Sequence, residues 1–326
     1  MELFDHLKFK IVRRGIRIAF PEATDTRILS AVARLKGEEL VDPVLIGKRA
    51  DIEQAATVRG INIASFTIYD PYGCDRWDEV VDAFVEVRKG KITREQAEVL
   101  LKDENYFGTM LTHMGITDGL VSGAIHSTGD TVRPALQIIK TKPGISRTSG
   151  AFLMMRGNEQ EKYLFADCAI NVSPSPQELA EIAIASAATA KMFDIDPKVA
   201  MLSFSTKGSA KAPQADATIE ATRIAQELAP DLVIDGELQF DAAYNQSVAQ
   251  LKAPESDVAG KANVYVFPDL QSGNIGYKLA QRLGNFEAIG PILQGLNKPI
   301  SDLSRGCNEE DVYKLSIITA AQTLND

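Results

Sequence analysis

The amino-acid sequence predicts an α/β protein with about two domains. Short apolar segments alternate with helical segments along most of the 326 residues, and this alternation is typical of parallel sheets covered by helices on both faces. The chain is also too long for one ordinary hydrophobic core. Near residue 150 two apolar segments follow one another directly, and we place a change of domain there.

The first half of the chain contains four expected strands. Each is a short apolar run ended by turn residues, while the segments between them have apolar residues three or four positions apart. The expected strands are 17–20, 43–47, 66–69 and 119–122, and the expected helices are 25–36, 51–58, 77–88, 93–101, 106–114 and 130–140. Pro134 suits a first helical turn better than a helix interior, so we expect it near the start of the last helix.

The second half begins with apolar segments at 150–156 and 162–167, joined by the polar turn GNEQE. This pattern predicts an antiparallel hairpin. An alanine-rich helix is expected next, at 176–193. Three strand–helix units complete this half: 199–203 with 214–228, 232–234 with 240–246, and 263–267 with 274–283.

The C-terminal stretch 299–318 has the clearest helix start in the chain. Asn308 is a good N-cap, and Asp311 falls three residues later, which resembles a capping box with Asp in place of Glu or Gln. Apolar residues follow at helical spacing and give this helix an inward face. The sequence does not say which domain that face contacts.

The loop before this helix contains Ser304, Arg305, Gly306 and Cys307. A helix N-terminus attracts anions, and an arginine beside it suits a phosphate group. A capped helix next to a solvated arginine explains the pattern equally well. A cation lowers a thiol pKa, but no histidine is adjacent to serve as a base, and a small buried cysteine is the commoner case. We therefore do not expect Cys307 to form a covalent intermediate.

Composition narrows the classes of function. The net charge of −9 argues against non-specific nucleic-acid binding, so a phosphate site would depend on a few placed arginines. The three cysteines are scattered and odd in number, which fits a reducing compartment. No metal-ligand spacing of His or Cys occurs, no apolar run reaches eighteen residues, and no signal peptide is evident. We expect a cytoplasmic protein without a metal or a membrane span.

Three loops follow expected strands and have ligand-binding composition, since ligands of open α/β sheets lie beyond the carboxyl ends of the strands. They are SGAIHSTGDTVR at 122–133, SFSTKGSAKAPQ at 203–214 and PDLQSGNIG at 268–276. Glycines allow backbone N–H groups to approach a phosphate, and hydroxyls add donors. Each loop alone is more often an ordinary turn. None contains G-x-x-x-x-G-K-[ST] or a complete G-x-G-x-x-G, so nucleotide hydrolysis and dinucleotide binding lack support.

Together these motifs resemble the phosphate acetyltransferase (phosphotransacetylase) family. The resemblance lies in SDLSRGCNEED at 301–311, GAIHSTGDTVRPALQIIKT at 123–141, FPDLQSGNIGYKLAQRLG at 267–284 and FPEATDTRIL at 20–29, and it runs essentially end to end. It implies reversible acetyl transfer between acetyl phosphate and coenzyme A, giving acetyl-CoA and inorganic phosphate, with coenzyme A as a substrate and no cofactor. It also implies a homodimer.

The resemblance further implies two α/β domains with a cleft between them, in an isocitrate/isopropylmalate dehydrogenase-like architecture. In that arrangement residues 1–147 and 297–326 form a discontinuous first domain, which the C-terminal helix completes. Residues 148–296 form the second domain.

Site residues carry over from the family motifs one by one. The catalytic serine and arginine match Ser304 and Arg305, and the aspartate base matches Asp311. Arginines for the phosphoryl group match Arg133, in a long motif, and Arg88, in the short context VEVRKGK. The candidate coenzyme A or phosphate loops contribute Ser205, Thr206, Lys207, Gly208, Ser272, Gly273 and Asn274.

The implied mechanism is direct thiolate attack on the acetyl carbonyl in a ternary complex, with Asp311 taking the thiol proton. An aspartate is a weak base toward a thiol, because ordinary pKa values of about 3.9 and about 8.5 leave a gap that costs about 6 kcal/mol if proton transfer precedes attack. We therefore favour proton transfer concerted with attack. Ser304 can donate to the thiolate or to the carbonyl oxyanion.

Three other functions come into consideration. A phosphate butyryltransferase has the same chemistry with a longer acyl chain, and one methylene changes binding by only about 1–3 kcal/mol. A decarboxylating dehydrogenase of the related fold needs a cofactor loop and clustered metal-binding aspartates, and neither is evident. A regulatory acetyl-CoA-binding module is disfavoured because Ser304, Arg305 and Asp311 are all present.

Overall fold

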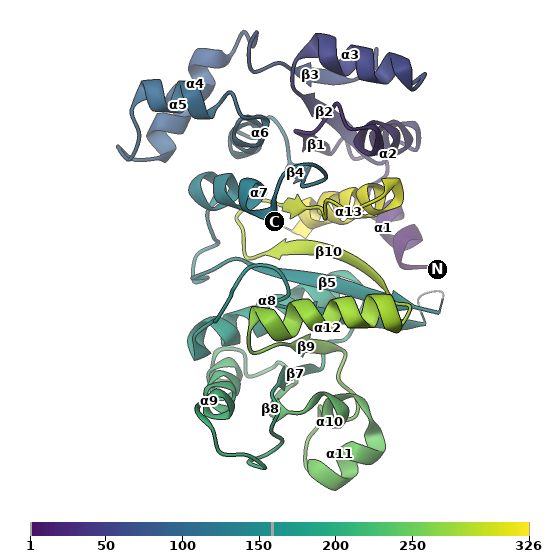
Figure 1. Ribbon diagram of the computed structural model, residues 1–326, viewed down its shortest axis with the longest axis vertical. Helices are drawn as coiled ribbons and strands as arrows, with labels where there is room; N and C mark the ends of the chain where they lie inside the picture. The colour runs from purple at the N-terminus through teal and green to yellow at the C-terminus, as the bar shows by residue number, and fades with distance from the viewer. Residues whose placement is uncertain (1, 158–159, 326) are drawn as a thin grey trace. The chain divides into compact units, whose positions relative to one another are not determined.

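The computed structural model describes residues 2–157 and 160–325. The chain forms two compact units (Figure 1): Met1–Lys142 with Leu296–Asp326, called the first unit below, and Pro143–Gly295, the second unit. Both units combine a sheet with helices, so the predicted α/β class is confirmed. The sequence placed the corresponding boundaries at 148 and 297.

The first unit contains a parallel sheet with strand order β3-β2-β1-β4-β11. Its strands are β1 (Arg17–Phe20), β2 (Asp42–Ile46), β3 (Thr67–Tyr69), β4 (Gly119–Ser122) and β11 (Ile300–Asp302). Its helices are α1 (Leu3–Ile11), α2 (Thr26–Gly37), α3 (Arg49–Val58), α4 (Trp77–Val87), α5 (Arg94–Leu100), α6 (Glu104–His113), α7 (Thr128–Pro134) and α13 (Glu309–Gln322).

The second unit has strand order β10-β5-β6-β9-β7-β8. Its strands are β5 (Ser149–Arg156), β6 (Glu161–Ala166), β7 (Val199–Leu202), β8 (Ile234–Leu238), β9 (Val264–Val266) and β10 (Glu287–Gln294). Its helices are α8 (Pro176–Met192), α9 (Pro213–Leu228), α10 (Phe240–Tyr244), α11 (Gln246–Lys252) and α12 (Leu270–Leu283). Strands β5 and β6 are antiparallel, which confirms the predicted hairpin, although residues 158–159 of its turn lie outside the described residues.

The C-terminal helix α13 packs against α1 and α2 of the first unit (Figure 1). Its start is the predicted capping box: the Asp311 N–H donates to Asn308 Oδ1, and the Asn308 N–H donates to Asp311 Oδ2, both at 2.9 Å. Residues on almost every side of the helix are buried. Helix α13 is therefore part of the core of the first unit. The sequence alone had not shown which domain its inward face contacts.

Several elements of the second half differ from expectation. Strands β10 and β11 were not predicted, because Gly290 and Pro291 interrupt the apolar run of β10 and because β11 has only three residues, two of them polar. Strand β8 lies at 234–238, later than the expected 232–234. Asn245 caps a separate helix, α11, so the expected helix at 240–246 ends early.

The helix that follows β4 begins earlier than predicted, and the expectation for Pro134 is wrong. Ser127 and Asp130 form a capping box at its start, so Pro134 is the last residue of α7 and not part of a first turn. A π-helix, Ala135–Ile139, continues the chain, and the Lys140 N–H donates to the Ala135 carbonyl at 3.0 Å. Proline has no N–H to donate within the helix, and a wider turn follows it.

A buried carboxylate organises the chain after β6. Asp167, which is 1% exposed, accepts hydrogen bonds from the backbone N–H groups of Gly150, Ala169, Ile170 and Asn171 at 2.8–3.1 Å, and from the Asn171 amide. The single side chain thus satisfies four backbone donors that would otherwise be buried without an acceptor.

We expect Asp167→Asn to lower the free energy of unfolding by about 2–4 kcal/mol, because an amide offers one acceptor oxygen and leaves buried N–H groups unpaired. Denaturant unfolding would measure the loss. Asp196→Asn is the control, since that side chain is 91% exposed and its replacement should change stability by less than about 0.5 kcal/mol. Equal stabilities for the two variants would contradict the structural role of Asp167.

Candidate active site

Three loops of the first unit lie together at the carboxyl edge of its parallel sheet. They follow β1, β4 and β11, and β4 is hydrogen-bonded to both of the other strands. The loops comprise residues 21–25, 123–127 and 303–308. This edge is where open α/β sheets bind ligands.

Glu22 joins the first two loops. Its side chain is fully buried, and its carboxylate accepts the backbone N–H groups of residues 123–126 at 2.7–3.0 Å and His126 Nδ1 at 2.8 Å. Burial raises the pKa of Glu22, but these hydrogen bonds outweigh burial and hold it below its usual range. The hydrogen bond to Glu22 in turn raises the pKa of His126. Glu22 is thus an ionised anchor for the loop after β4.

Gly123 allows the loop after β4 to meet the end of β11. Its φ is +111°, and a Cβ at this position would lie 2.4 Å from Asp302 Oδ1 and 2.5 Å from the Leu303 nitrogen. No side chain fits in that space, and the backbone conformation also favours glycine.

Arg27 connects all three loops. Its guanidinium donates to the carbonyl oxygens of Arg305 and Cys307 at 3.0 Å each, and to that of Ala124 at 2.8 Å. Asp25, the N-cap of α2, orients the guanidinium by accepting from Nε at 3.0 Å and from Nη2 at 2.8 Å. The planar fork of arginine makes these simultaneous contacts possible.

The predicted catalytic residues lie on the third loop and the start of α13. Ser304 and Arg305 are exposed, and the Gly306 N–H donates to Ser304 Oγ at 3.3 Å. Within the described part of the chain, the Arg305 guanidinium makes no hydrogen bond or ion pair, so it is available to a ligand. Asp311 faces this loop with one carboxylate oxygen engaged by the Asn308 N–H.

Cys307 is a poor nucleophile in this structure, as the sequence indicated. Its side chain is buried, and burial raises its pKa to about 11 although the charge of Arg27 acts in the opposite direction. A thiol is nucleophilic as the thiolate, so Cys307 stays protonated and unreactive near neutral pH.

The other two predicted arginines lie around Tyr106 of α6. Burial raises the pKa of the Tyr106 hydroxyl, while the charges of Arg133 and Arg88 both lower it. Arg133 is exposed on α7, which packs against β11. Arg88 donates from Nη1 to the Gln137 carbonyl at 3.4 Å, and its buried Nε has no partner among the described residues. Both arginines are thus close enough to Tyr106 for their charges to act on its hydroxyl group.

The predicted loop after β7 uses its polar groups internally. Ser205 Oγ and the Gly208 N–H both donate to the buried carboxylate of Glu237 at 2.8 Å, and Thr206 Oγ1 donates to Gln239 Oε1 at 3.2 Å. The Lys207 ammonium is bound by Asp235. A role for this loop in binding coenzyme A stays a prediction.

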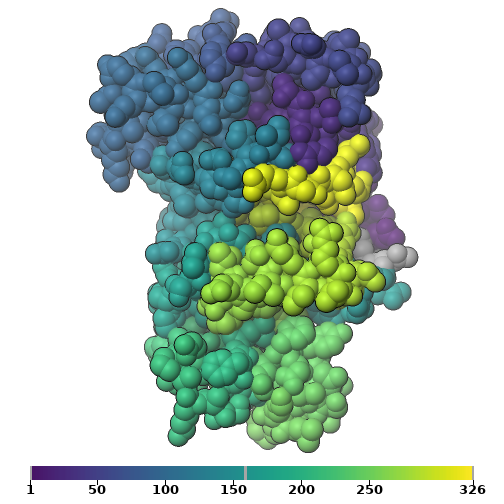
Figure 2. Space-filling view, viewed as in Figure 1, coloured from purple at the N-terminus to yellow at the C-terminus, as the bar shows by residue number. Residues whose placement is uncertain are grey.

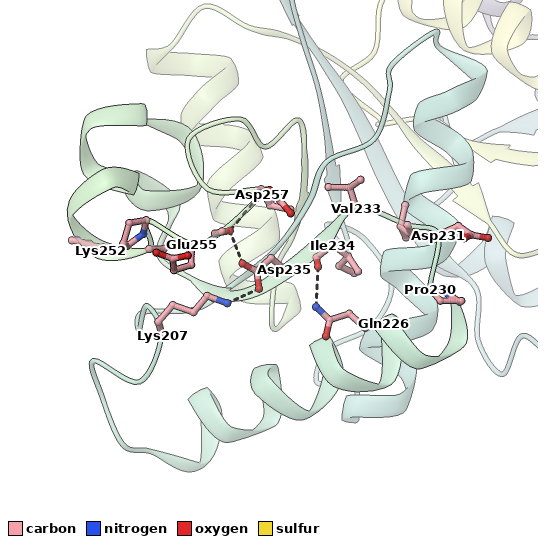
Figure 3. Close-up of a pocket in the computed structure, with 15 residues that line it drawn as sticks. Lys207, Gln226, Pro230, Asp231, Val233, Ile234, Asp235, Lys252, Glu255 and Asp257 are labelled. Atoms are coloured by element: carbon pink, nitrogen blue, oxygen red, sulfur yellow. Dashed lines mark hydrogen bonds and ion pairs between the residues drawn. The ribbon is translucent and has the colours of Figure 1, made fainter.

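Lys207 also lines an open cavity of about 790 Å³ beside the edge strand β8 (Figure 3). Asp235 also lines the cavity and accepts from Lys207 and from Ser256 Oγ, while Gln226 donates to the Ile234 carbonyl at 3.0 Å. These polar groups thus already have partners. None of the predicted catalytic residues lines this cavity.

Ser272, Gly273 and Asn274 are not in a loop, which corrects the prediction. Helix α12 starts at Leu270 because Asp269 caps it by accepting from the Ser272 N–H at 2.8 Å. A Cβ on Gly273 would lie 2.3 Å from the Asp167 carbonyl oxygen, and Asn274 donates to the Cys168 carbonyl at 3.1 Å. Gly273 and Asn274 thus fasten α12 to the chain just after β6, while Ser272 belongs to the helix cap. A role of the three residues in ligand binding stays a prediction.

Three residues at the sheet edge were missed: Glu22, Arg27 and Asp302. Glu22 and Arg27 lie in the motif FPEATDTRIL directly after β1, and their place after a strand was the available signal. Asp302 ends an unpredicted strand. It is fully buried, and burial raises its pKa to about 6, although the hydroxyls of Thr128 and Thr131 lower it in part. Within residues 2–157 and 160–325, neither of its carboxylate oxygens has a partner in hydrogen-bond geometry.

The described residues contain no group of three or more His, Cys, Asp or Glu side chains that could hold a metal ion. In the same part of the chain, no helix has the length and apolar character needed to span a bilayer.

The fold defines an α/β protein of two units, with Ser304 and Arg305 exposed beyond the carboxyl edge of the sheet in the first unit. Comparison with known proteins gives the family: the model for "Phosphate acetyl/butaryl transferase" matches residues 3–320, and the chain belongs to that family. It is 59% identical over 323 residues to phosphate acetyltransferase of Bacillus subtilis and 56% identical over 328 residues to that of Staphylococcus epidermidis. Each alignment covers 99% of this chain and 99% of the relative.

A solved structure agrees with these matches. The crystal structure of a phosphotransacetylase from Streptococcus pyogenes has 62% sequence identity and a TM-score of 0.97, covering 99% of this chain and 98% of that one. The resemblance inferred from the sequence motifs is therefore confirmed.

Replacing Asp302 should stabilise the protein in a pH-dependent manner. Because its pKa in the folded chain is about 6 and an ordinary aspartate has about 3.9, the folded state loses about 3 kcal/mol when the carboxyl ionises. This cost begins above pH 3.9 and is complete above pH 6. Asp302→Asn should therefore raise the free energy of unfolding by about 3 kcal/mol at pH 8 and by about half as much at pH 5.

Denaturant unfolding at pH 8 and pH 5 tests this expectation. Asp118→Asn is the control, because Asp118 pairs with Arg17 at 3.0 Å and its loss should not stabilise the fold. An Asp302→Asn variant that is less stable than the wild type at pH 8 would contradict the assignment of an unpartnered buried charge.

Proposed function

We propose that this protein is a phosphate acetyltransferase, which transfers an acetyl group reversibly between acetyl phosphate and coenzyme A. The observation that carries the proposal is the sequence similarity, over the full length, to proteins named phosphate acetyltransferase. Ser304, Arg305 and Asp311 support it, because they lie together on one loop and the start of the helix that follows. The products are acetyl-CoA and inorganic phosphate. Coenzyme A is a substrate, and no cofactor takes part.

The reaction proceeds by direct thiolate attack in a ternary complex. Asp311 accepts the thiol proton, the sulfur attacks the acetyl carbonyl carbon, and the bond to the phosphate oxygen breaks. Arg305, Arg133 and Arg88 bind the phosphoryl oxygens and stabilise the charge that develops on the leaving group. Ser304 donates a hydrogen bond to the thiolate or the carbonyl oxygen. Orientation of two bound substrates supplies much of the acceleration.

Formation of the thioester from acetyl phosphate and coenzyme A, followed by its ultraviolet absorbance, tests the proposal. The wild type should form acetyl-CoA, and Arg305→Ala should not do so at a comparable rate. Butyryl phosphate distinguishes the second candidate function, phosphate butyryltransferase, which the family description also covers. Binding of acetyl-CoA without turnover would instead indicate a regulatory module.

Asp311→Asn should lower kcat by at least about 100-fold, since general-base catalysis contributes about 10²–10⁴-fold. The amide oxygen can still accept from the Asn308 N–H, so the helix cap and the fold should persist. Circular dichroism would verify folding before the rate is measured. Near-normal turnover in a folded variant would exclude Asp311 as the base.

Arg27→Lys should lower kcat by at least about tenfold, because lysine cannot bind the carbonyl groups of two loops and the Asp25 carboxylate at once. Small displacements of catalytic groups lower the rate. Arg13→Lys is the matched control, since Arg13 pairs with Glu39 on the surface. Steady-state kinetics of both variants would make the comparison, and full activity in Arg27→Lys would refute the role.

We further propose a cytoplasmic homodimer. Ile275, Leu279 and Leu283 lie one turn apart on α12 and are 57%, 52% and 79% exposed. Helix α12 is on the molecular surface (yellow-green in Figure 2). An exposed apolar stripe of this kind supports an interface. Analytical ultracentrifugation should give a dimer for the wild type and a larger monomer fraction for Leu279→Glu.

A further inference from the structure

A second cavity, of about 560 Å³, lies at the amino edge of the parallel sheet in the first unit. Its lining residues stand where three strands begin: Arg17 is the first residue of β1, Asp118 directly precedes β4, and Lys298 lies two residues before β11. The candidate catalytic loops follow the same three strands at the carboxyl edge. The cavity is therefore separate from the site that contains Ser304 and Arg305.

This cavity is basic, although the protein as a whole has a net charge of −9. Three cationic side chains line it, those of Arg14, Arg17 and Lys298, and one acidic side chain, that of Asp118. Two of the cations meet at Gly115. Arg17 Nη2 donates to the Gly115 carbonyl at 3.0 Å, and Lys298 Nζ lies 3.9 Å from the position that a Cβ on Gly115 would take.

The carboxylates near the cavity are already bound by other groups. Asp118 accepts the Arg17 backbone N–H at 2.8 Å and Arg17 Nη2 at 3.0 Å. Asp42, whose Oδ2 lies 3.8 Å from the position of a Cβ on Gly15, forms an ion pair with Lys36 at 2.5 Å. These carboxylates thus do not neutralise the two remaining cations of the cavity.

Arg14 and Lys298 are those two cations. Within residues 2–157 and 160–325, neither side chain donates to a carboxylate or to a backbone carbonyl, so neither serves to cap a helix C-terminus. The surplus of positive charge also acts on His113 of α6. Burial lowers the pKa of His113, and the charges of Lys298 and Lys140 lower it further. The amino edge therefore holds positive charge that the described part of the fold does not use.

An unpaired arginine beside an unpaired lysine suits a phosphate group. A phosphate monoester has nearly two negative charges and three strong acceptor oxygens on one group, so a single phosphate can contact both cations. The volume of the cavity falls in the range of small-molecule sites, about 300–1,000 Å³, and leaves room for an organic part.

The rest of the lining favours a hydrophilic organic part. Asn297 and Thr323 contribute polar side chains to the cavity. The Asn297 amide nitrogen donates to the carbonyl groups of Ile139 and Thr141 at 3.0 and 2.9 Å. Its amide oxygen has no donor among the described residues, and it can accept a hydrogen bond from a ligand hydroxyl.

We propose that this cavity is a binding site for a small phosphate monoester with a hydroxylated organic part, and that Arg14 and Lys298 bind the phosphate group. Arg17, held in place by Asp118, adds to the positive potential. The inference does not depend on the proposed function, because none of the predicted catalytic residues lines the cavity. A ligand here contacts segments that precede three strands, so its binding also stabilises the folded first unit.

Glycerol 3-phosphate is a suitable probe, because it combines a phosphate monoester with two hydroxyls. Isothermal titration should be performed on full-length Arg305→Ala, in which phosphate binding at the catalytic loop is weakened, and should detect binding of the probe. Adding Arg14→Ala and Lys298→Ala should raise the Kd at least about tenfold, because two charges in contact with a dianion are removed. Glycerol, which lacks the phosphate, should not bind.

A matched control tests whether position or net charge matters. Arg59→Ala with Lys102→Ala, again in Arg305→Ala, removes the same charge from exposed side chains of the first unit that do not line the cavity. The Kd should then change by less than about twofold. If Lys298→Ala disturbs folding, Arg14→Ala alone decides, since its side chain is exposed and unpaired, and it should raise the Kd at least about threefold.

Several results would overturn the proposal. They are an absence of glycerol 3-phosphate binding to Arg305→Ala, a Kd that the cavity substitutions leave unchanged, and an equal loss of affinity in the control variant. Tricarballylate, which has three carboxylates and no phosphate, tests the class of ligand, and tighter binding of it than of glycerol 3-phosphate would refute the assignment of a phosphate ester. Thioester formation by the wild type is a separate measurement that decides the proposed function.

Discussion

The hydrogen bonds of Arg27 are the interaction on which the active-site geometry depends. The loop with Ser304 and Arg305 follows a strand of only three residues, and such a short strand fixes little of what comes after it. Arg27 reaches this loop from α2 and holds its carbonyl groups while Asp25 fixes the guanidinium. The side chain of Arg305 can thus remain unpaired while its backbone is fixed, which is the arrangement a preorganised anion site needs.

Buried carboxylates play contrasting parts in this protein. Glu22 and Asp167 each collect several N–H groups and determine the shape of one loop. Asp302 is equally buried without such donors among the described residues. A buried carboxylate therefore stabilises the local structure at Glu22 and Asp167 but destabilises the fold at Asp302. The difference lies in the number of N–H groups that donate hydrogen bonds to the carboxylate.

The spacing of apolar residues in the sequence was sufficient to predict most helices and strands, because it indicates which face of a helix or strand is buried. It failed at β11, where the buried residues Ser301 and Asp302 are polar, and at β10, where glycine and proline interrupt the strand. Only part of the candidate site could be predicted from the sequence. Ser304, Arg305 and Asp311 belong to one motif, whereas Glu22 and Arg27 contact loops about 100 and 280 residues away in the sequence. Contacts of that kind depend on the order of strands in the sheet.

The π-helix after Pro134 affects more than the local path of the chain. A π turn contains an extra residue compared with an α turn, and it leaves carbonyl groups near its end free for other donors. Gln137 accepts from Arg88, and Ile139 accepts from Asn297 at 3.0 Å, which ties the returning C-terminal segment to this point. The π-helix thus joins two segments that are distant in the sequence, the end of α4 at Arg88 and the returning chain at Asn297.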